Sequence, residues 1–148
     1  MATSPVLINS LVGLFQMAAV SRKRRSKTLL LTNAVTNACR WAVAFHTALA
    51  LEQGLDPEDV DAIRERRLPK DSKLATLSAL AKALIERRGR LDDQDVDRFI
   101  AAGFGKDHAL EVIAVVAAST TILAASRKRL SRRRSRLTPG PLEASRSP

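Results

Sequence analysis

The sequence has few of the residues that build β-sheets or disulfide frameworks. It contains no tyrosine and a single cysteine, and aromatic residues are only 3% of its 148 residues. Sheets are enriched in aromatic and β-branched residues, so this composition favours closely packed helices. A single cysteine excludes a disulfide within the chain and is typical of a reducing compartment. We therefore expect a cytoplasmic, all-α protein.

Acidic residues are also scarce, but only in two short segments. The formal net charge is +10, and residues 21–27 (SRKRRSK) and 127–148 contribute +5 and +7 of it, which leaves −2 for all other residues. A basic tail at residues 127–148 would contact the phosphates of a nucleic acid without reading its base sequence. The stretch AAGFGKDHALEV (101–112) resembles a helix-turn-helix, but the helix that follows has no polar face to enter a groove. We expect no specific nucleic-acid binding.

Long hydrophobic runs that would mark a leader or a membrane span are not convincing either. Residues 5–20 are apolar but precede their positive charge, whereas a secretory signal has the reverse order. Residues 109–125 (ALEVIAVVAASTTILAA) are interrupted by Glu111 and by Ser119, Thr120 and Thr121. A bilayer span needs about 20 predominantly apolar residues. The pattern predicts a buried core helix, with no membrane partner.

Start and stop signals divide the chain into about six helices. Aspartates followed by apolar periodicity at Asp56, Asp71 and Asp92 predict helix starts, and Gly54, Gly89 and Gly103 predict ends. We expect helices at 4–20, 26–53, 56–66, 71–89, 92–103 and from 106 to about Leu130. One domain should span residues 1–126, followed by a basic, disordered tail over residues 127–148.

Apolar periodicity indicates which helix faces are buried. Leu74, Leu77, Leu80, Ala81 and Leu84 share one face of the 71–89 helix, and Val96, Phe99 and Ile100 form a stripe on the next. Residues 41–51 and the last helix are apolar nearly all round, which is typical of a helix that is central or covered by another subunit. Trp41 is then a core or interface residue.

The stretch TNACRWAVAFH (36–46) holds the single cysteine, Cys39, and one of two histidines, His46. If a helix restarts at Asn37, Cys39 lies in its first turn, where the helix dipole favours a thiolate. In an unbroken helix the thiol is inert. His46 lies about 10.5 Å further along the helix axis, too far for a direct hydrogen bond, and the bridging position is Ala42. A buried structural thiol and a core histidine are the alternative interpretation.

Three stretches carry a resemblance to a known family: NACRWAVAFHTALALEQGL (37–55), DPEDVDAIRERRLPKDSKLATLSALAKAL (56–84) and DDQDVDRFIAAGFGKDHALEVIAVVAASTTIL (92–123). Over about Ser4 to Leu123 the sequence resembles the carboxymuconolactone decarboxylase-like superfamily, in its alkyl hydroperoxidase D-like branch. The resemblance implies an all-α fold and a homo-oligomer. Many members of that family reduce hydroperoxides with a Cys-x-x-Cys pair, a histidine four residues after it and a glutamate twelve residues before it.

Position by position, the resemblance places the first cysteine at Cys39 and the histidine at His46. The second cysteine corresponds to Ala42 and the glutamate to Lys27. It thus implies at most a one-cysteine peroxidase, in which a hydroperoxide oxidises Cys39 to a sulfenic acid and an external thiol reduces it. The alternative is a catalytically degenerate member, a helical oligomer that binds a small ligand or a partner. No cofactor and no metal are expected in either case.

Overall fold

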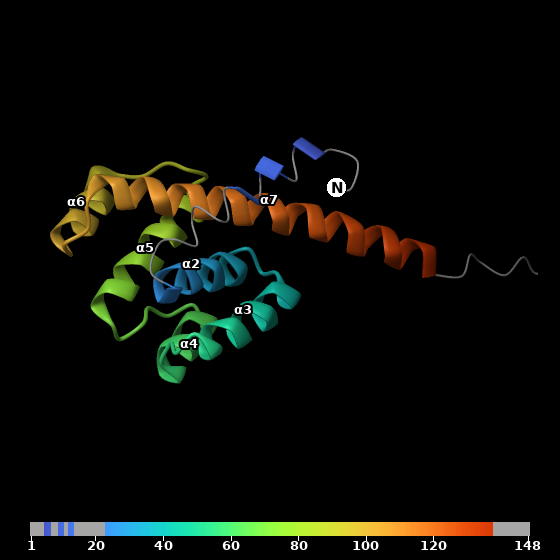
Figure 1. Ribbon diagram of the computed structural model, residues 1–148, viewed down its shortest axis with the longest axis horizontal. Coiled ribbons are helices and arrows are strands. Elements are labelled where there is room, and N and C mark those ends of the chain that lie inside the picture. The colour runs from blue at the N-terminus through green and yellow to red at the C-terminus, as the bar shows by residue number, and fades with distance from the viewer. Residues whose placement is uncertain (1–4, 7–8, 11, 14–22, 138–148) are drawn as a thin grey trace, which may run out of the picture.

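Six helices make up most of the chain that the structure describes (Figure 1). This computed structural model describes residues 5–6, 9–10, 12–13 and 23–137, with side chains as far as Ala124 in the last helix. No strand occurs among these residues, so the all-α prediction is confirmed. The first predicted helix, 4–20, lies mainly outside the described residues. The helices are α2 (Lys23–Thr36), α3 (Arg40–Glu52), α4 (Pro57–Arg64), α5 (Ser72–Glu86), α6 (Asp93–Ala101) and α7 (Lys106–Leu137).

Three helices begin at the aspartates that the sequence indicates. Asp56 precedes Pro57 and accepts a hydrogen bond from the backbone N–H of Glu58 at 2.8 Å. Asp71 accepts two such bonds at the start of α5. Asp92 is the N-cap of α6, as predicted. Each such cap satisfies backbone groups that the helix leaves free, and stabilises the fold by about 1 kcal/mol.

Helices α2 to α6 end in the same way, with a residue in the left-handed backbone region after the last turn. Two of the predicted glycine terminators, Gly54 and Gly103, have φ of 76° and 83°. Three other helices use a residue that is not glycine, namely Ala38, Arg66 and Arg88, at φ of 50°, 64° and 55°. Backbone N–H groups at these turns bond back to the last carbonyls of the helix, as in the Schellman motif.

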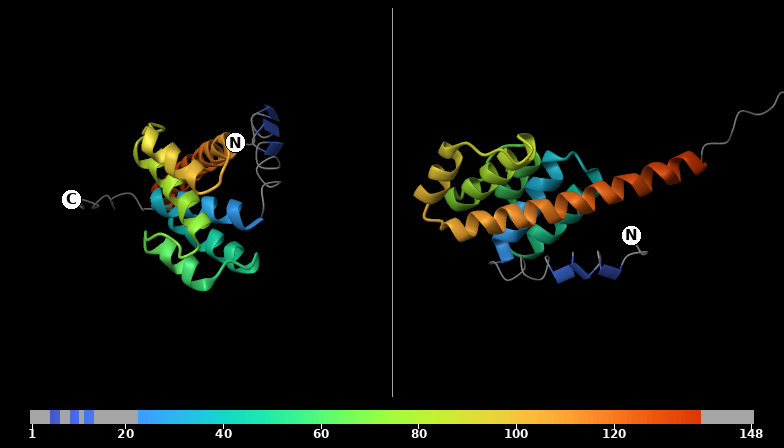
Figure 2. Two further views of the ribbon diagram at one scale, coloured as in Figure 1. Left: turned by 90° about the vertical axis from the view of Figure 1, so that its left-hand side faces the viewer. Right: turned by 90° about the horizontal axis from the view of Figure 1, so that it is seen from above.

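The central helix is α2, which packs against α3, α4, α5 and α7. On its far side α5 packs in turn against α6 and α7. The longest helix, α7, crosses the body and projects beyond it (Figure 2). It ends at Leu137 instead of about Leu130, because leucine and arginine are good helix formers and the first proline after it is Pro139. Residues 138–148 of the predicted tail lie outside the described residues, and the division at 126 stays a prediction.

The main core lies between α2, α5, α6 and α7. All five predicted residues of α5 are buried in it, against Leu29 of α2, Phe99 of α6 and Val112 of α7. Phe99 is fully buried, whereas its neighbour Ile100 is 40% exposed, so the predicted stripe on α6 is only partly right. Adjacent helical residues point about 100° apart, and Phe99 takes the inward direction.

The sequence offers two alternatives for residues 41–51, a central helix or a helix covered by another subunit. The first alternative is wrong, because α3 is not central. Only Ala42 and Ala50 of this helix are buried. Trp41, Phe45 and Leu51 are 41%, 51% and 44% exposed, so Trp41 is not a core residue. A central position belongs to α2 instead, and α3 leaves one aromatic face uncovered in the single chain.

Candidate functional site

A break between α2 and α3 places Cys39 at the start of a helix. α2 ends at Thr36, the backbone turns through Ala38, and α3 begins at Arg40 with Cys39 as its N-cap. The N–H of Cys39 donates to the carbonyl of Ala34 at 3.0 Å, and the amide of Asn37 donates to the carbonyl of Asn33 at 3.0 Å. The single helix expected over residues 26–53 is therefore wrong, and the alternative of a restart is present, shifted by two or three residues from Asn37.

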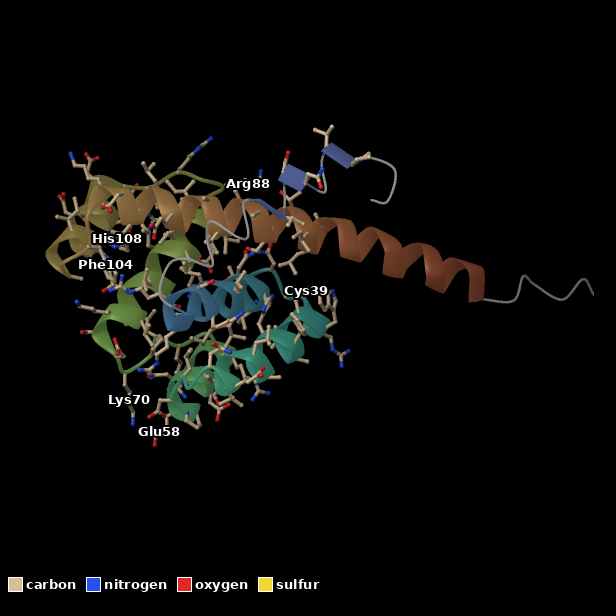
Figure 3. The ribbon with its side chains drawn as sticks, in the orientation of Figure 1. Cys39, Glu58, Lys70, Arg88, Phe104 and His108 are labelled. Carbon is tan, nitrogen blue, oxygen red and sulfur yellow. The ribbon has the colours of Figure 1, made fainter. Side chains whose placement is uncertain are left out.

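The Cys39 thiol is enclosed by aliphatic side chains. It is 3% exposed and packs with Ala34, Ala42 and Leu123, the last of these from α7 (Figure 3). Its side chain makes no capping hydrogen bond with the free N–H groups of α3. The start of the helix is thus occupied by the cysteine backbone, while the sulfur is turned into the protein interior.

His46 lies two turns further along α3 and is half-buried. Burial, and secondly the nearby positive charge of Lys27, lower the pKa of its imidazole from 6.5 to about 4. Its Nδ1 atom is buried and has no hydrogen-bond partner among the described residues, and the ring packs edge-on against Phe45 at 5.2 Å between centroids. The imidazole is therefore neutral at physiological pH and is not oriented through Nδ1 by a neighbouring acid.

Ala42 separates the two predicted site residues. It is fully buried, and its methyl group offers neither a donor nor an acceptor. Cys39 and His46 keep the axial separation of about 10.5 Å expected for seven helical residues. The structure places both on α3 but does not join them into a reactive pair.

The other histidine, His108, has a capping role. Its Nδ1 accepts a hydrogen bond from the backbone N–H of Gly105 at 3.1 Å, one turn earlier at the start of α7. Its ring also packs edge-on against Phe104 at 5.8 Å between centroids, at the opposite end of the body from Cys39 (Figure 3). His108 therefore has a structural role at the start of α7.

A buried polar network between α2 and α7 is the feature that sequence reasoning missed. The amide of the fully buried Asn33 donates to the Ser119 hydroxyl, and its carbonyl oxygen accepts from Asn37 at 2.7 Å and from Thr120 at 3.1 Å. Ser119 itself donates to the carbonyl of Val115 at 2.8 Å. The signal was present as polar residues inside two apolar runs, but it does not show which residues pair.

Beside this network lies a groove of about 480 Å³, which we call the α5–α7 groove. Its walls are mainly apolar and come from the end of α5 and the middle of α7, with Leu84, Ile85, Ile113 and Val116 among them. A volume of this size falls within the range of small-molecule sites, about 300 to 1,000 Å³.

Four polar side chains complete the α5–α7 groove, namely Asn37, Arg88, Thr120 and Thr121. Asn37 and Thr120 extend the buried network to its surface, and Arg88 contributes a guanidinium from the turn after α5 (Figure 3). A second hollow, of about 430 Å³, lies beside the start of α3 and is lined partly by Arg40 and Thr47. Neither hollow is lined by Cys39 or His46.

The described residues contain one candidate membrane span and no candidate metal centre. No group of three or more histidine, cysteine, aspartate or glutamate side chains there could hold a metal ion. One stretch, Lys106–Ala124, is long and apolar enough to cross a membrane by length and composition alone. Core helices satisfy the same criterion, but only a third of this stretch is buried, including Val112 and Val115. Leu110 and Ile113 are 67% and 41% exposed, so the prediction of a buried core helix is only partly right.

No protein-family model matches the sequence, and no curated protein matches it. The resemblance to the carboxymuconolactone decarboxylase-like superfamily therefore stays a prediction from the sequence.

Proposed function

We propose that this chain is a degenerate relative of the alkyl hydroperoxidase D-like proteins, which binds a small ligand and does not turn over hydroperoxides. The observation that carries the proposal is the enclosure of Cys39, which is 3% exposed among aliphatic side chains and lines neither of the two hollows beside α3 and α7. A thiolate must reach the peroxide oxygen to attack it, and the enclosure of the sulfur prevents that contact.

The missing residues point the same way. In the two-cysteine cycle, the thiolate attacks the peroxide O–O bond and releases an alcohol, and the resulting sulfenic acid condenses with a second thiol to a disulfide and water. Ala42 occupies the second position and Cys39 is the single cysteine, so this second step has no partner within the chain. Lys27 supplies a positive charge near His46 where a relay would need a base.

Binding has the better structural support. The α5–α7 groove combines apolar walls with a small number of fixed polar groups, which is the usual composition of a ligand site. Thr120 is held by its hydrogen bond to the buried Asn33, so this polar position is set before any ligand arrives. A preorganised site loses less entropy on binding.

An oligomer is part of the proposal. Trp41, Phe45 and Leu51 leave an aromatic and aliphatic face of α3 open to solvent, and such side chains are enriched at the centres of protein interfaces. A second copy of the chain would cover this face. The proposal also retains the expectations of a reducing, cytoplasmic setting and of no specific nucleic-acid or membrane partner.

A one-cysteine peroxidase is the second candidate, and one observation favours it. Cys39 is retained at the N-cap of α3, and His46 on the same helix is neutral at physiological pH because its pKa is about 4. A neutral imidazole can accept a proton through water. This candidate needs an external thiol and an opening that exposes the sulfur.

The deciding experiment is the reaction of the reduced protein with an organic hydroperoxide in the presence of a dithiol. We expect peroxide loss no faster than with Cys39→Ser, and an unmodified thiol by intact mass. The same protein unfolded in urea should be oxidised at Cys39, which would show that enclosure and not chemistry protects it. Turnover by the folded protein that disappears in Cys39→Ser would instead establish the one-cysteine peroxidase.

A further inference from the structure

Arg88 is a charged side chain without an ionic partner among the described residues. Its neighbour Arg87 bonds to Asp92 at 2.5 Å and to Asp95 at 2.6 Å, which uses the acidic groups at the start of α6. Arg88 is exposed, and no carboxylate lines the α5–α7 groove beside it. The groove therefore has a net positive charge that the described part of the protein does not neutralise.

The backbone conformation at Arg88 disfavours arginine relative to glycine at this position. It has φ of 55°, in the left-handed region that glycine occupies without strain, and the next residue is Gly89 at φ of 86°. A side chain at such a helix end gives up the advantage of glycine. Arg66 occupies the equivalent turn after α4 at φ of 64° but does not line the groove. It provides a matched position for comparison.

The chemistry of the lining selects the ligand. A guanidinium presents a planar fork of donors that matches a carboxylate through two parallel hydrogen bonds. The remaining lining is mostly aliphatic, from Ile85, Ile113 and Val116, with the Thr120 hydroxyl as a further polar group. Apolar walls do not suit a multiply charged phosphate ester, which would have to lose its hydration. A volume of about 480 Å³ in the lower part of the small-ligand range suits a medium-length aliphatic body.

We infer that the α5–α7 groove binds an amphiphilic monocarboxylate, with Arg88 on the carboxylate and the aliphatic chain against α5 and α7. This inference rests on the proposed ligand-binding function and adds the chemical class of the ligand. Two parts of the groove then have separate roles, because the walls supply affinity for the chain and Arg88 supplies preference for the anion.

The test is calorimetric titration of the full chain at pH 7.5 with octanoate and with 1-octanol, which differ mainly in the charged head group. Octanoate should bind at least about tenfold more tightly than octanol, the discrimination expected of one charge-assisted contact. Arg88→Gln should remove that preference, Arg88→Lys should keep part of it, and Arg66→Gln should leave it unchanged. Ala117→Phe, on the exposed side of the groove, should weaken both ligands.

The outcomes separate this inference from the function on which it rests. Equal binding of octanol and octanoate, with both weakened in Ala117→Phe, would keep the ligand site and overturn the role of Arg88. No binding of either ligand to the folded wild type would overturn both proposals. If Ala117→Phe changes the sedimentation of the protein and not its ligand affinity, another copy covers the groove and the inference is wrong.

Discussion

At the scale of single residues, Lys27 and His46 form a pair in which both groups are basic. The positive charge of Lys27 acts with burial to hold the imidazole of His46 in its neutral form. A carboxylate at the same position would stabilise the imidazolium and could accept its proton. The substitution of a glutamate by a lysine, which the resemblance implies, therefore reverses the electrostatics around His46 as well as removing a base.

This arrangement predicts that the protein loses stability as the pH falls below 6.5. Between pH 6.5 and 4 the unfolded chain takes up a proton at His46 and the folded chain does not, so protonation favours unfolding. From neutral pH to pH 5, where carboxylates are still largely ionised, the free energy of unfolding should fall by at most about 2 kcal/mol from this group, because solvent screens part of the effect on a half-buried side chain. Urea denaturation across this range measures it.

Two variants isolate the source of that pH dependence. His46→Gln should remove this component, since glutamine does not titrate. Lys27→Gln should reduce it, because the native pKa of His46 then lies nearer 6.5. An identical slope in wild type and His46→Gln would contradict the prediction.

Sequence reasoning reached the identity of these residues but not their environment. Cys39, Ala42 and His46 follow from their spacing on one helix face, whereas Lys27 is the position that the resemblance implies for the glutamate. The burial of the Cys39 sulfur depends on Leu123, which is 84 residues later in the sequence and comes from another helix. No local pattern encodes such a contact, so the site was predictable as a set of positions and not as a cavity.

At the scale of helices, starts were easier to predict than ends. An N-cap depends on one side chain that bonds to nearby backbone, so Asp56 and Asp71 could be recognised as helix starts from the sequence. The end of α2 uses Ala38 in the left-handed region, a conformation that alanine rarely adopts. The packing of α2 against α3, on either side of this turn, holds Ala38 in the strained conformation.

Ala38→Gly should therefore stabilise the protein. Glycine relieves the strain of the left-handed backbone at φ of 50°, which outweighs its larger entropy in the unfolded chain, for a net gain of about 0.5 to 1 kcal/mol. Thermal unfolding should shift upward by about 3 °C. Ala48→Gly, at an exposed position inside α3, is the matched control and should destabilise by about 1 kcal/mol. A lower melting temperature for Ala38→Gly would show that this turn is not strained.

At the scale of the whole molecule, the order of the helices was predictable but their arrangement was not. Helical periodicity identified the buried face of α5 correctly, because one face of that helix is covered along its whole length. Periodicity cannot distinguish a central helix from an apolar helix at the surface, so the sequence of α3 fits both positions. The exposure of Trp41 and Phe45 excludes the central position and supports the proposed oligomer.

The proposed oligomer gives a prediction at this scale. Phe45→Glu places a charge in the exposed aromatic face of α3 and should weaken self-association at least about 30-fold, as expected for a central aromatic contact. Sedimentation velocity measures the shift toward monomer. Leu68→Glu changes an equally exposed leucine away from α3 and should leave the oligomer intact. A monomeric wild type at micromolar concentration would refute the prediction.

The bond between Asn33 and Ser119 has a further consequence during synthesis. The two residues are 86 positions apart, and translation makes the asparagine long before its partner. Until α7 leaves the ribosome, α2 has neither the hydroxyl that satisfies Asn33 nor the valines that cover Leu29. In the nascent chain, α2 therefore stays incompletely packed until α7 has been translated.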